Sequence, residues 1–383
     1  MSKETKITII GFLTMFIVGV SDLIVVGILL PMSKAFHVSP ALMGQLVTIY
    51  ACAFAVLSPL LTKWTRKWAD KYTLVGSILI FILVTFLTIW VRSFAMLCVL
   101  RVILAGSASL ITVKLMAIGA KICVPEKKAK VVANIYVGFS AANILGIPLG
   151  MLLANYFDWS VPFYLICCIA LLCLAMIHFG INKMAFETVQ NNQGDYHVLS
   201  KKGVIIILLF LFLMMVSTSL LFTYVEPLIR QGGHSLSVVS IALFISGVAG
   251  VIGSKLGNLL AEKYGYVLSG TIITVVYSVS LLGLLLGSGN VTIVLLCILL
   301  WNLFHWGTNP TVQYALLQFV KGDPSQLFSY NIAILNLGIG IGSLLGGMLF
   351  AMDNEFTYSL LVAIGLSGIS FILLQSLRRI EVH

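Results

Sequence analysis

The chain has 383 residues, of which 60% are hydrophobic and 9% are charged, and its mean hydropathy is +1.08. This composition leaves too little polar surface for a water-soluble globule of this length and indicates a protein that folds in lipid. A formal net charge of +10 would suit a nucleic-acid-binding protein, but the basic residues are placed as in a membrane protein.

Twelve long apolar segments follow one another along the chain, separated by short polar loops. A helix needs roughly 20 apolar residues to cross a hydrocarbon core about 30 Å thick. Because lipid offers no hydrogen-bond partners and the segments lack strand-like alternation, each is expected to be a helix. We therefore predict an all-α membrane protein with twelve transmembrane helices, near residues 7–31, 42–62, 74–92, 96–122, 131–155, 160–181, 204–230, 236–262, 267–287, 290–317, 327–352 and 356–377.

The basic residues of the loops lie mainly on one side of these spans. With the N-terminus inside, seventeen Lys and Arg residues fall on the cytoplasmic side, and only Lys34, Arg92 and Arg230 fall outside. This asymmetry follows the positive-inside rule and requires an even number of spans. We expect both termini in the cytoplasm of a bacterial-type plasma membrane, and nucleic acid is not needed as a partner.

The longest polar stretch, residues 182–203, divides the chain into two halves of six spans, 1–181 and 204–383. A shift of 192 residues aligns two separate parts of these halves: Ala69-Asp70-Lys71-Tyr72 with Ala261-Glu262-Lys263-Tyr264, and Gly146, Ile147 and Gly150 with Gly338, Ile339 and Gly342. Two matches at one shift indicate a duplicated six-helix bundle. Some secondary transporters have this arrangement, with a substrate site at the midplane, although an inert scaffold or a membrane-embedded enzyme would also be compatible with duplication.

Three charged residues lie deep inside predicted spans, where a charge is costly and is typical of a functional site. Asp22 and Arg101 lie at similar depths on the first and fourth spans, so their side chains meet if these helices are neighbours facing a common cavity. Burial and a nearby guanidinium have opposite effects on the protonation of a carboxylate, so Asp22 is a candidate proton switch and Arg101 its fixed charge. A permanent structural ion pair is the alternative. Lys114, roughly 20 Å further along the fourth span, either lines the inner vestibule or extends its ammonium to the inner interface.

Polar residues also gather near two prolines of the second half. Glu226 precedes Pro227 near the outer end of the seventh span and is either an external gate or an interfacial charge. The tenth span contains His305, Trp306, Asn309, Pro310 and Gln313, and Pro310 predicts a broken helix beside a cavity. Hydrogen bonding between helices is the alternative role for these polar groups.

The chain shows no sign of soluble catalysis or of a bound metal. It has no phosphate-binding Gly-rich loop and no HExxH or paired-Cys motif, and its seven cysteines lie in or at the ends of spans without ligand spacing. We predict neither an enzyme nor a cofactor. The first apolar segment is too long for a signal peptide and is expected to stay as a helix.

Several stretches resemble the major facilitator superfamily, and specifically its twelve-span drug:proton antiporters. The segment from Gly19 to Leu29 resembles the first helix of bacterial purine-efflux and sugar-efflux permeases, in which an acidic residue occupies the place of Asp22. The segment Arg101–Gly106 is similar to the fourth-helix Arg motif. The fifth-helix antiporter motif, the most specific signal, is matched by residues 138–150, with Gly138, Asn143, Gly146, Pro148 and Gly150.

The second half resembles two branches of this group. The segment Tyr224-Val-Glu226-Pro227 resembles the sugar-efflux branch, whereas Trp306 to Gln313 is closer to the purine-efflux branch. The family's Gly-rich loop after the second helix is degraded around Asp70 and Lys71, and its better copy is Gly257–Gly265, with Glu262 and Lys263. Lys114 has no counterpart that we can place.

The resemblance implies the major facilitator fold and export of a small organic solute by proton antiport with alternating access. The implied coupling residues are Asp22 and Arg101. Aromatic and amide groups of the implied cavity favour a drug, a purine base or a nucleoside; a sugar-efflux permease and a sensor without transport are the alternatives. We expect a monomer whose partners are the solute, protons and lipid, and the implied cavity residues are Tyr50, Lys114, Tyr136, Asn143, Tyr224, Glu226, His305, Trp306, Asn309 and Gln313.

Overall fold

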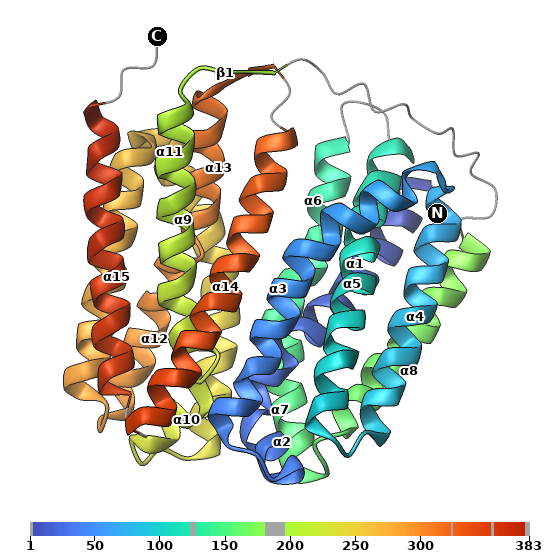
Figure 1. Cartoon of the computed structure of the whole chain (residues 1–383), viewed down its shortest axis with the longest axis horizontal. Coiled ribbons are helices and arrows are strands. Elements are labelled where there is room, and N and C mark those ends of the chain that lie inside the picture. Colours follow the sequence, from blue (N-terminus) through green and yellow to red (C-terminus); the bar gives the residue numbers. More distant parts are fainter. Residues whose placement is uncertain (1–2, 123–127, 181–195, 323–324, 354–355, 380–383) are drawn as a thin grey trace. The chain divides into compact units, whose positions relative to one another are not determined.

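The computed structural model describes residues 3–122, 128–180, 196–322, 325–353 and 356–379 (Figure 1). By its contacts the chain divides into two compact units: residues 1–39 with 49–190, and residues 40–48 with 191–383. The segment 40–48 is therefore grouped with the second unit, although the sequence assigned it to the first half. The expected linker, 182–203, lies mainly outside the described residues.

The first unit is helical throughout its described part. Two of its spans are interrupted near prolines, so that the first is divided into α1 and α2 and the fifth into α6 and α7. The elements are α1 (Lys3–Gly27), α2 (Leu29–Phe36), α3 (Pro40–Trp64), the 3₁₀ turn η1 (Thr65–Lys67), α4 (Asp70–Trp90), α5 (Phe94–Ile122), α6 (Lys128–Ala141), the π-helical turn η3 (Ala142–Gly146), α7 (Ile147–Tyr156) and α8 (Val161–Gly180).

The second unit adds one small strand pair to its helices. Its elements are β1 (Tyr196–Val198), α9 (Lys201–Phe222), α10 (Val225–Gln231), α11 (Leu236–Gly287), α12 (Val291–His305), α13 (Thr308–Gln318), β2 (Val320–Gly322), α14 (Ser325–Asp353), α15 (Thr357–Ser376) and the 3₁₀ turn η4 (Leu377–Arg379). Strands β1 and β2 pair antiparallel, with Val198 opposite Val320. Since each strand has three residues, the prediction of an all-α fold is confirmed.

Eleven helices of the described part are long and apolar enough to cross a membrane, judged by length and composition. Ten correspond to one expected span each, and α11 covers the two expected near 236–262 and 267–287. Gly265 separates these two, because its φ of 77° and ψ of 162° interrupt the helix in a conformation that suits glycine. The structure thus accounts for the twelve predicted spans.

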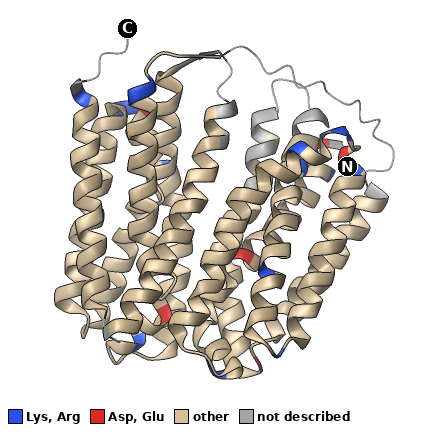
Figure 2. Cartoon of the chain, viewed as in Figure 1, with Lys and Arg blue, Asp and Glu red and all other residues tan. Residues whose placement is uncertain are grey.

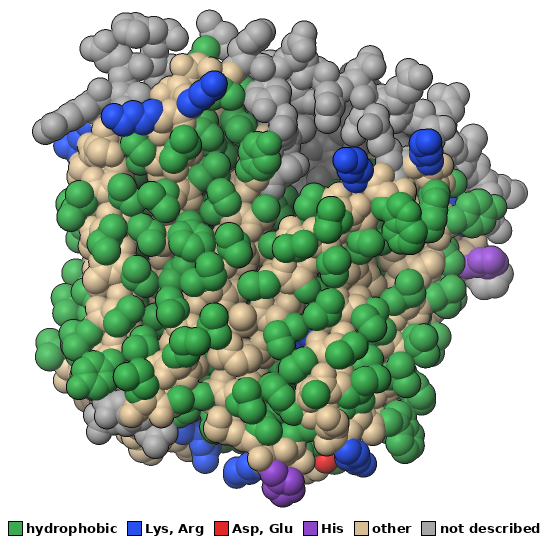
Figure 3. Space-filling model, in the orientation of Figure 1, with side chains coloured by type: hydrophobic (Ala, Val, Ile, Leu, Met, Phe, Trp, Pro, Cys, Tyr) green, Lys and Arg blue, Asp and Glu red, His purple; other side chains and the backbone are tan. Residues whose placement is uncertain are grey.

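In each unit taken by itself, Lys and Arg residues concentrate near the helix ends (Figure 2), and hydrophobic side chains cover most of the described surface in the view of Figure 3. Large apolar side chains are exposed along the spans, such as Leu83 of α4, Ile205 of α9 and Leu286 of α11. An apolar surface this extensive suits contact with lipid rather than water.

Hydroxyl side chains within the spans donate hydrogen bonds to backbone carbonyls of their own helix. Thr14 Oγ1, for example, donates to the Ile10 carbonyl at 2.7 Å.

Two prolines coincide with helix breaks in the second unit. Helix α9 ends at Phe222 and α10 begins at Val225, two residues before Pro227. Helix α12 ends at His305 and α13 begins at Thr308, which places Pro310 in the first turn of α13, where its missing N–H is tolerated. The predicted break in the tenth span is confirmed.

Equivalent glycine contacts recur in the two units at the shift of 192 residues. A Cβ atom on Gly146 would meet Val20 of α1, and one on the equivalent Gly338 would meet Phe212 of α9, which is also equivalent to Val20. In the same way, Gly150 faces Ile24 and Gly342 faces Val216. Small residues at these positions let the helix backbones approach closely. The duplication inferred from sequence therefore extends to packing inside each unit.

Candidate functional site

Arg101 of α5 is the most deeply buried charge among the described residues of the first unit, with 2% of its surface exposed. Its Nη1 donates a hydrogen bond of 2.9 Å to the backbone carbonyl of Ser21 in α1, the residue that precedes Asp22. Its guanidinium carbon also lies 6.0 Å from the ring centroid of Tyr50 in α3. Helices α1, α3 and α5 thus bring Asp22, Arg101 and Tyr50 into one region.

Asp22 and Arg101 are neighbours without being directly bonded. No ion pair links their side chains in this described region, and Asp22 is partly exposed. Among described residues, three buried polar atoms nearby also lack a hydrogen-bond partner: Ser21 Oγ, Tyr50 Oη and Arg101 Nη2. The guanidinium therefore keeps an unused donor close to a carboxyl group that is not fixed by an ion pair.

Lys114 has a partner that we did not foresee from the sequence. Its Nζ lies 2.9 Å from Asp70 Oδ1, and both side chains are largely buried, with 7% and 13% exposed. Asp70 is the first residue of α4, where a carboxylate also interacts favourably with the helix dipole. The ion pair joins α4 to α5, whereas we had expected Lys114 to line a vestibule or to reach the interface.

His305 belongs to a chain of buried hydrogen bonds inside the second unit. Its Nδ1 lies 2.8 Å from Thr218 Oγ1, and Thr218 Oγ1 donates to Tyr277 Oη at 3.2 Å. Tyr277 Oη lies 2.8 Å from Ser217 Oγ, which donates to the Ala363 carbonyl at 2.8 Å. The chain connects α9, α11, α12 and α15, which is the alternative role that we had named for this histidine.

The number of available protons fixes the direction of these bonds. Each hydroxyl carries one hydrogen, so Ser217, which donates to a carbonyl, must accept from Tyr277. Thr218 uses its hydrogen on Tyr277, so Nδ1 of His305 must be protonated and donate to Thr218. The network therefore assigns the hydrogen of His305 to Nδ1.

The other polar residues of the tenth span lie in α13 or at its start. Asn309 Oδ1 accepts a hydrogen bond of 2.8 Å from Asn331 Nδ2 of α14. Trp306 packs against Gly250 of α11, and Gln313 is partly exposed. The Trp306 ring lies edge-on to the His305 ring, with centroids 6.2 Å apart, whereas Asn309 bonds to α14 and Gln313 remains accessible.

Tyr224 lies at the break between α9 and α10 and is fully buried. Its hydroxyl lies 3.2 Å from the carbonyls of Ala41 and Ser343 and 3.4 Å from Gln45 Nε2. Ala41 and Gln45 belong to the segment 40–48, which is grouped with this unit. Glu226 is also buried, with 1% exposed.

The fifth-span motif forms the π-helical turn η3. The Ile147 N–H bonds to the Ala142 carbonyl five residues back, next to Pro148, whose lack of an N–H disturbs the regular ladder. Asn143 is buried in this turn, and its Nδ2 lies 3.5 Å from the Phe139 carbonyl. The side chain of Tyr136 lies outside the described residues.

The loop motifs have unequal contacts in the two units. Gly257 of α11 packs directly on Gly307, and Glu262 Oε1 accepts from Asn258 Nδ2 at 2.7 Å. Lys263 Nζ lies 5.0 Å from the ring centroid of Tyr264. Lys71 directly follows Asp70 at the start of α4.

Among the described residues, no cluster of three or more His, Cys, Asp or Glu side chains could hold a metal ion.

Sequence reasoning missed the residues that bond to the predicted ones. Ser21 contributes a backbone carbonyl, and Ser217, Thr218 and Tyr277 contribute hydroxyls. Hydroxyl residues are frequent in membrane helices and carbonyls are present everywhere, so neither has a distinguishing sequence signal. Asp70 had such a signal, because it follows the second span on the side toward which Lys114 points.

Comparison with known proteins agrees with this architecture. The family model described as Major Facilitator Superfamily matches residues 10–326. Three relatives from Bacillus subtilis (strain 168) bear the name uncharacterized MFS-type transporter. YbcL is 27% identical, with 91% of this chain and 89% of YbcL covered; for YfhI the figures are 26%, 95% and 92%. YceJ is 29% identical over 66% of each chain.

These matches extend over both units, and the relatives are covered nearly from end to end in two of the three cases. A family model that matches residues 10–326 includes the coupling-site candidates of the first unit and the broken tenth span of the second. The chain, with its two six-helix halves, belongs to the major facilitator superfamily of membrane transporters.

Proposed function

We propose that the protein exports a small organic solute in exchange for protons, by alternating access. The observation that carries this proposal is the partly exposed Asp22 beside the buried Arg101, without an ion pair between them. A carboxyl group in this position is available to bind and release a proton, whereas arginine stays charged. The electrostatic energy of the site therefore depends on the protonation of Asp22, which is what a proton switch requires.

The transport cycle follows from that dependence. Asp22 takes a proton from the outer side, the loaded protein turns inward, and proton release to the cytoplasm accompanies solute binding before the return step. A ligand shifts a conformational equilibrium only by its difference in affinity for the two states, so the proton and the solute must favour opposite states. The membrane potential adds about 2.3 kcal/mol per charge per 100 mV to the driving force.

The surroundings favour a solute that is mostly uncharged. Arg101 donates to the Ser21 carbonyl beside Asp22, and Lys114 is paired with Asp70, so both cations interact with groups of the protein itself. The accessible aromatic and amide groups, such as Trp306 and Gln313, suit stacking and neutral hydrogen bonds. A purine base, a nucleoside or an aromatic drug fits this chemistry.

The test is solute uptake by inverted membrane vesicles with an imposed pH gradient. A panel of radiolabelled purine bases, nucleosides and uncharged antibiotics is compared between the wild-type protein and Asp22→Asn. Asp158→Asn is the matched control, because Asp158 is an exposed loop residue whose bonds, to the N–H and hydroxyl of Ser160, are local. We expect the wild type and the control to accumulate solute uphill and Asp22→Asn to lose this ability.

Uphill accumulation by Asp22→Asn at the wild-type level would contradict the assigned role of Asp22. Uptake at the wild-type rate after both the pH gradient and the membrane potential are collapsed would indicate a uniporter. A wild type that transports no member of the panel, with the protein shown to be folded and inserted, would favour a sensor with a transporter fold.

A further inference from the structure

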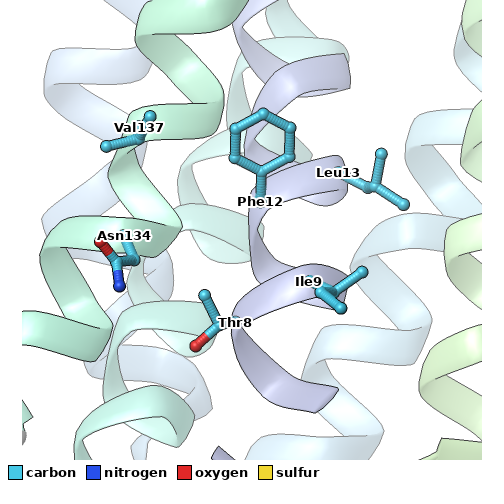
Figure 4. Close-up of a pocket in the computed structure, with 6 residues that line it drawn as sticks. All are labelled: Thr8, Ile9, Phe12, Leu13, Asn134 and Val137. Atoms are coloured by element: carbon cyan, nitrogen blue, oxygen red, sulfur yellow. The ribbon is translucent and has the colours of Figure 1, made fainter. Parts of the chain in front are cut away.

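A pocket opens between α1 and α6 in the first unit (Figure 4). It has a volume of about 380 Å³, within the range of roughly 300–1,000 Å³ that is typical of small-molecule sites. Six residues line it: Thr8, Ile9, Phe12, Leu13, Asn134 and Val137. The helices touch beside the pocket, where Gly138 of α6 packs against the backbone of Phe12.

The two polar residues of this pocket lie near one another. Thr8 and Asn134 lie toward one end in Figure 4, and Phe12 and Val137 lie toward the other. Thr8 Oγ1 donates its hydrogen to the Glu4 carbonyl at 2.8 Å, so it offers a guest only an acceptor. The exposed Asn134 makes no hydrogen bond to another described side chain or backbone group, so its amide can both donate and accept.

The position of Asn134 argues against simple contact with lipid. It begins an exposed stripe of the fifth span that continues with Val137, Leu145 and Leu149, each about half exposed. Position 134 lies within the predicted span 131–155. An amide left without partners in hydrocarbon costs several kcal/mol in order of magnitude, so Asn134 is better placed facing water or a polar guest.

None of the described residues that line the pocket carries an ionisable group. Asp22 is nine residues beyond Leu13 on α1, which corresponds to roughly 14 Å along the helix. A charged guest would therefore find no compensating charge in the pocket, whereas an uncharged guest could stack on Phe12 and bond to Asn134.

We propose that the α1–α6 pocket is an entry subsite that binds the solute as an uncharged, flat, largely apolar molecule, held through one amide-like edge by Asn134, before it reaches Asp22. This inference rests on the proposed transport function and adds the solute class and its first contact. The apolar groups hold the hydrophobic part, and Asn134 selects for a carbonyl beside an N–H or O–H group. The separation from Asp22 allows solute capture to precede proton release.

The test uses the full-length protein in inverted vesicles, with cysteine introduced as Asn134→Cys. Modification by a charged, membrane-impermeant methanethiosulfonate is measured at position 134 by peptide mass spectrometry, with and without chloramphenicol as an uncharged aromatic amide probe. Leu79→Cys, at a half-exposed apolar position of α4, is the control for a lipid-facing residue. We expect position 134 to react at least about tenfold faster than position 79 and chloramphenicol to slow its modification.

Two results would overturn the proposal. Reaction at 134 only with a membrane-soluble maleimide would show a lipid-filled groove, and reaction with the charged reagent that chloramphenicol does not slow would show a hydrated surface without a subsite. A second measurement, equilibrium binding of radiolabelled chloramphenicol, compares Asn134→Leu with Asp22→Asn. We expect Asn134→Leu to weaken binding about three- to tenfold, since one hydrogen bond is lost.

The same comparison separates this proposal from the proton-coupled function. Asp22→Asn is expected to bind the probe normally and to lose uphill transport. Normal uphill transport by Asp22→Asn together with weakened binding by Asn134→Leu would sustain the subsite and reject the coupling role. Unchanged binding by Asn134→Leu, or no binding by the wild type, would reject the subsite whatever the transport results.

Discussion

The two units share their helix packing but differ in their ionisable residues. In the first unit, Gly146 of η3 and Gly150 of α7 pack against α1. At the shift of 192 residues, Gly338 and Gly342 of α14 pack against α9 in the same way. At the same shift, the three charged residues deep in the spans of the first unit fall on uncharged ones, because Asp22, Arg101 and Lys114 correspond to Met214, Ile293 and Trp306. The two units therefore share the scaffold and the charged loop pair Asp70-Lys71 and Glu262-Lys263, but not the charges inside the spans.

The second unit has its own polar interior, in which a chain of uncharged hydrogen-bonding groups runs between helices, in addition to the buried Glu226. His305, Thr218 and Tyr277 correspond at the same shift to Val113, Val26 and Thr85 in the first unit. One unit therefore holds charges whose interactions can change with protonation, and the other holds a hydrogen-bond chain that joins four helices. We therefore place the proposed proton coupling in the first unit.

The largest effect is expected from removing the fixed charge of the first unit. Arg101→Met deprives Asp22 and the Ser21 carbonyl of their cationic neighbour, whereas Ile293→Met changes the equivalent position, which is exposed and apolar. We expect Arg101→Met to reduce uphill accumulation about tenfold or more, because 1.4 kcal/mol already changes an equilibrium about tenfold. Ile293→Met should transport normally. Equal losses in both variants would contradict the asymmetry.

A second prediction distinguishes equivalent glycines in the repeated packing. A Cβ on Gly342 would meet the backbone carbonyl of Val216, whereas one on Gly150 would meet the movable end of Ile24. We expect Gly342→Ala to lower the free energy of unfolding by about 1–3 kcal/mol and Gly150→Ala by less. Thermal unfolding in detergent measures which of the two variants loses more stability.

Gly365→Ala is the control for these two variants, because nothing lies near a Cβ at that position. Alanine is a better helix former than glycine by up to about 1 kcal/mol, so this variant should be no less stable than the wild type. If Gly150→Ala proved more destabilising than Gly342→Ala, the stability losses could not be explained by contact with a movable side chain in one case and with a backbone carbonyl in the other.

A third prediction concerns the Lys114–Asp70 ion pair, which has no equivalent charge at Trp306. Lys114→Met removes the partner that lies 2.9 Å from a largely buried carboxylate, and Asp70→Asn removes the carboxylate itself. Breaking one side of a buried pair costs more than replacing both sides. We expect the double variant to be more stable than the sum of the single effects by about 1–2 kcal/mol. Strictly additive effects, measured by thermal unfolding, would show that the pair contributes nothing.

Sequence alone predicted the spans because a helix must satisfy its backbone and expose apolar side chains to lipid. The break before Pro310 was predictable for a similar reason, since proline lacks the N–H that a continuous helix needs. The sequence predicted that Asp22 and Arg101 are neighbours, because they lie at similar depths on two helices. It did not predict their hydrogen-bond partners, because packing sets the rotation of each helix about its axis.

Other parts of the site depended on contacts that sequence does not encode locally. Lys114 was expected to line a vestibule or to reach the interface, but its partner Asp70 lies 44 residues away and belongs to a motif that we had treated separately. His305 was expected beside a cavity, whereas it bonds to Thr218, a residue without a distinguishing signal. The grouping of residues 40–48 with the second unit was likewise not visible in the hydropathy pattern.

The smallest effect is expected from the direction of the hydrogen bond at His305. Since Nδ1 must donate to Thr218, His305→Asn can replace the donor with its amide nitrogen at a similar distance from the backbone. His305→Gln moves its amide to the position of Nε2 and leaves Thr218 without this bond. We expect the Asn variant to be more stable by about 1 kcal/mol, measured by thermal unfolding. Equal stability of the two variants would contradict the assigned hydrogen position. At the equivalent position of the first unit, stability does not depend on a hydrogen-bond donor, because Val113 has none and no such chain of bonds joins the described helices there.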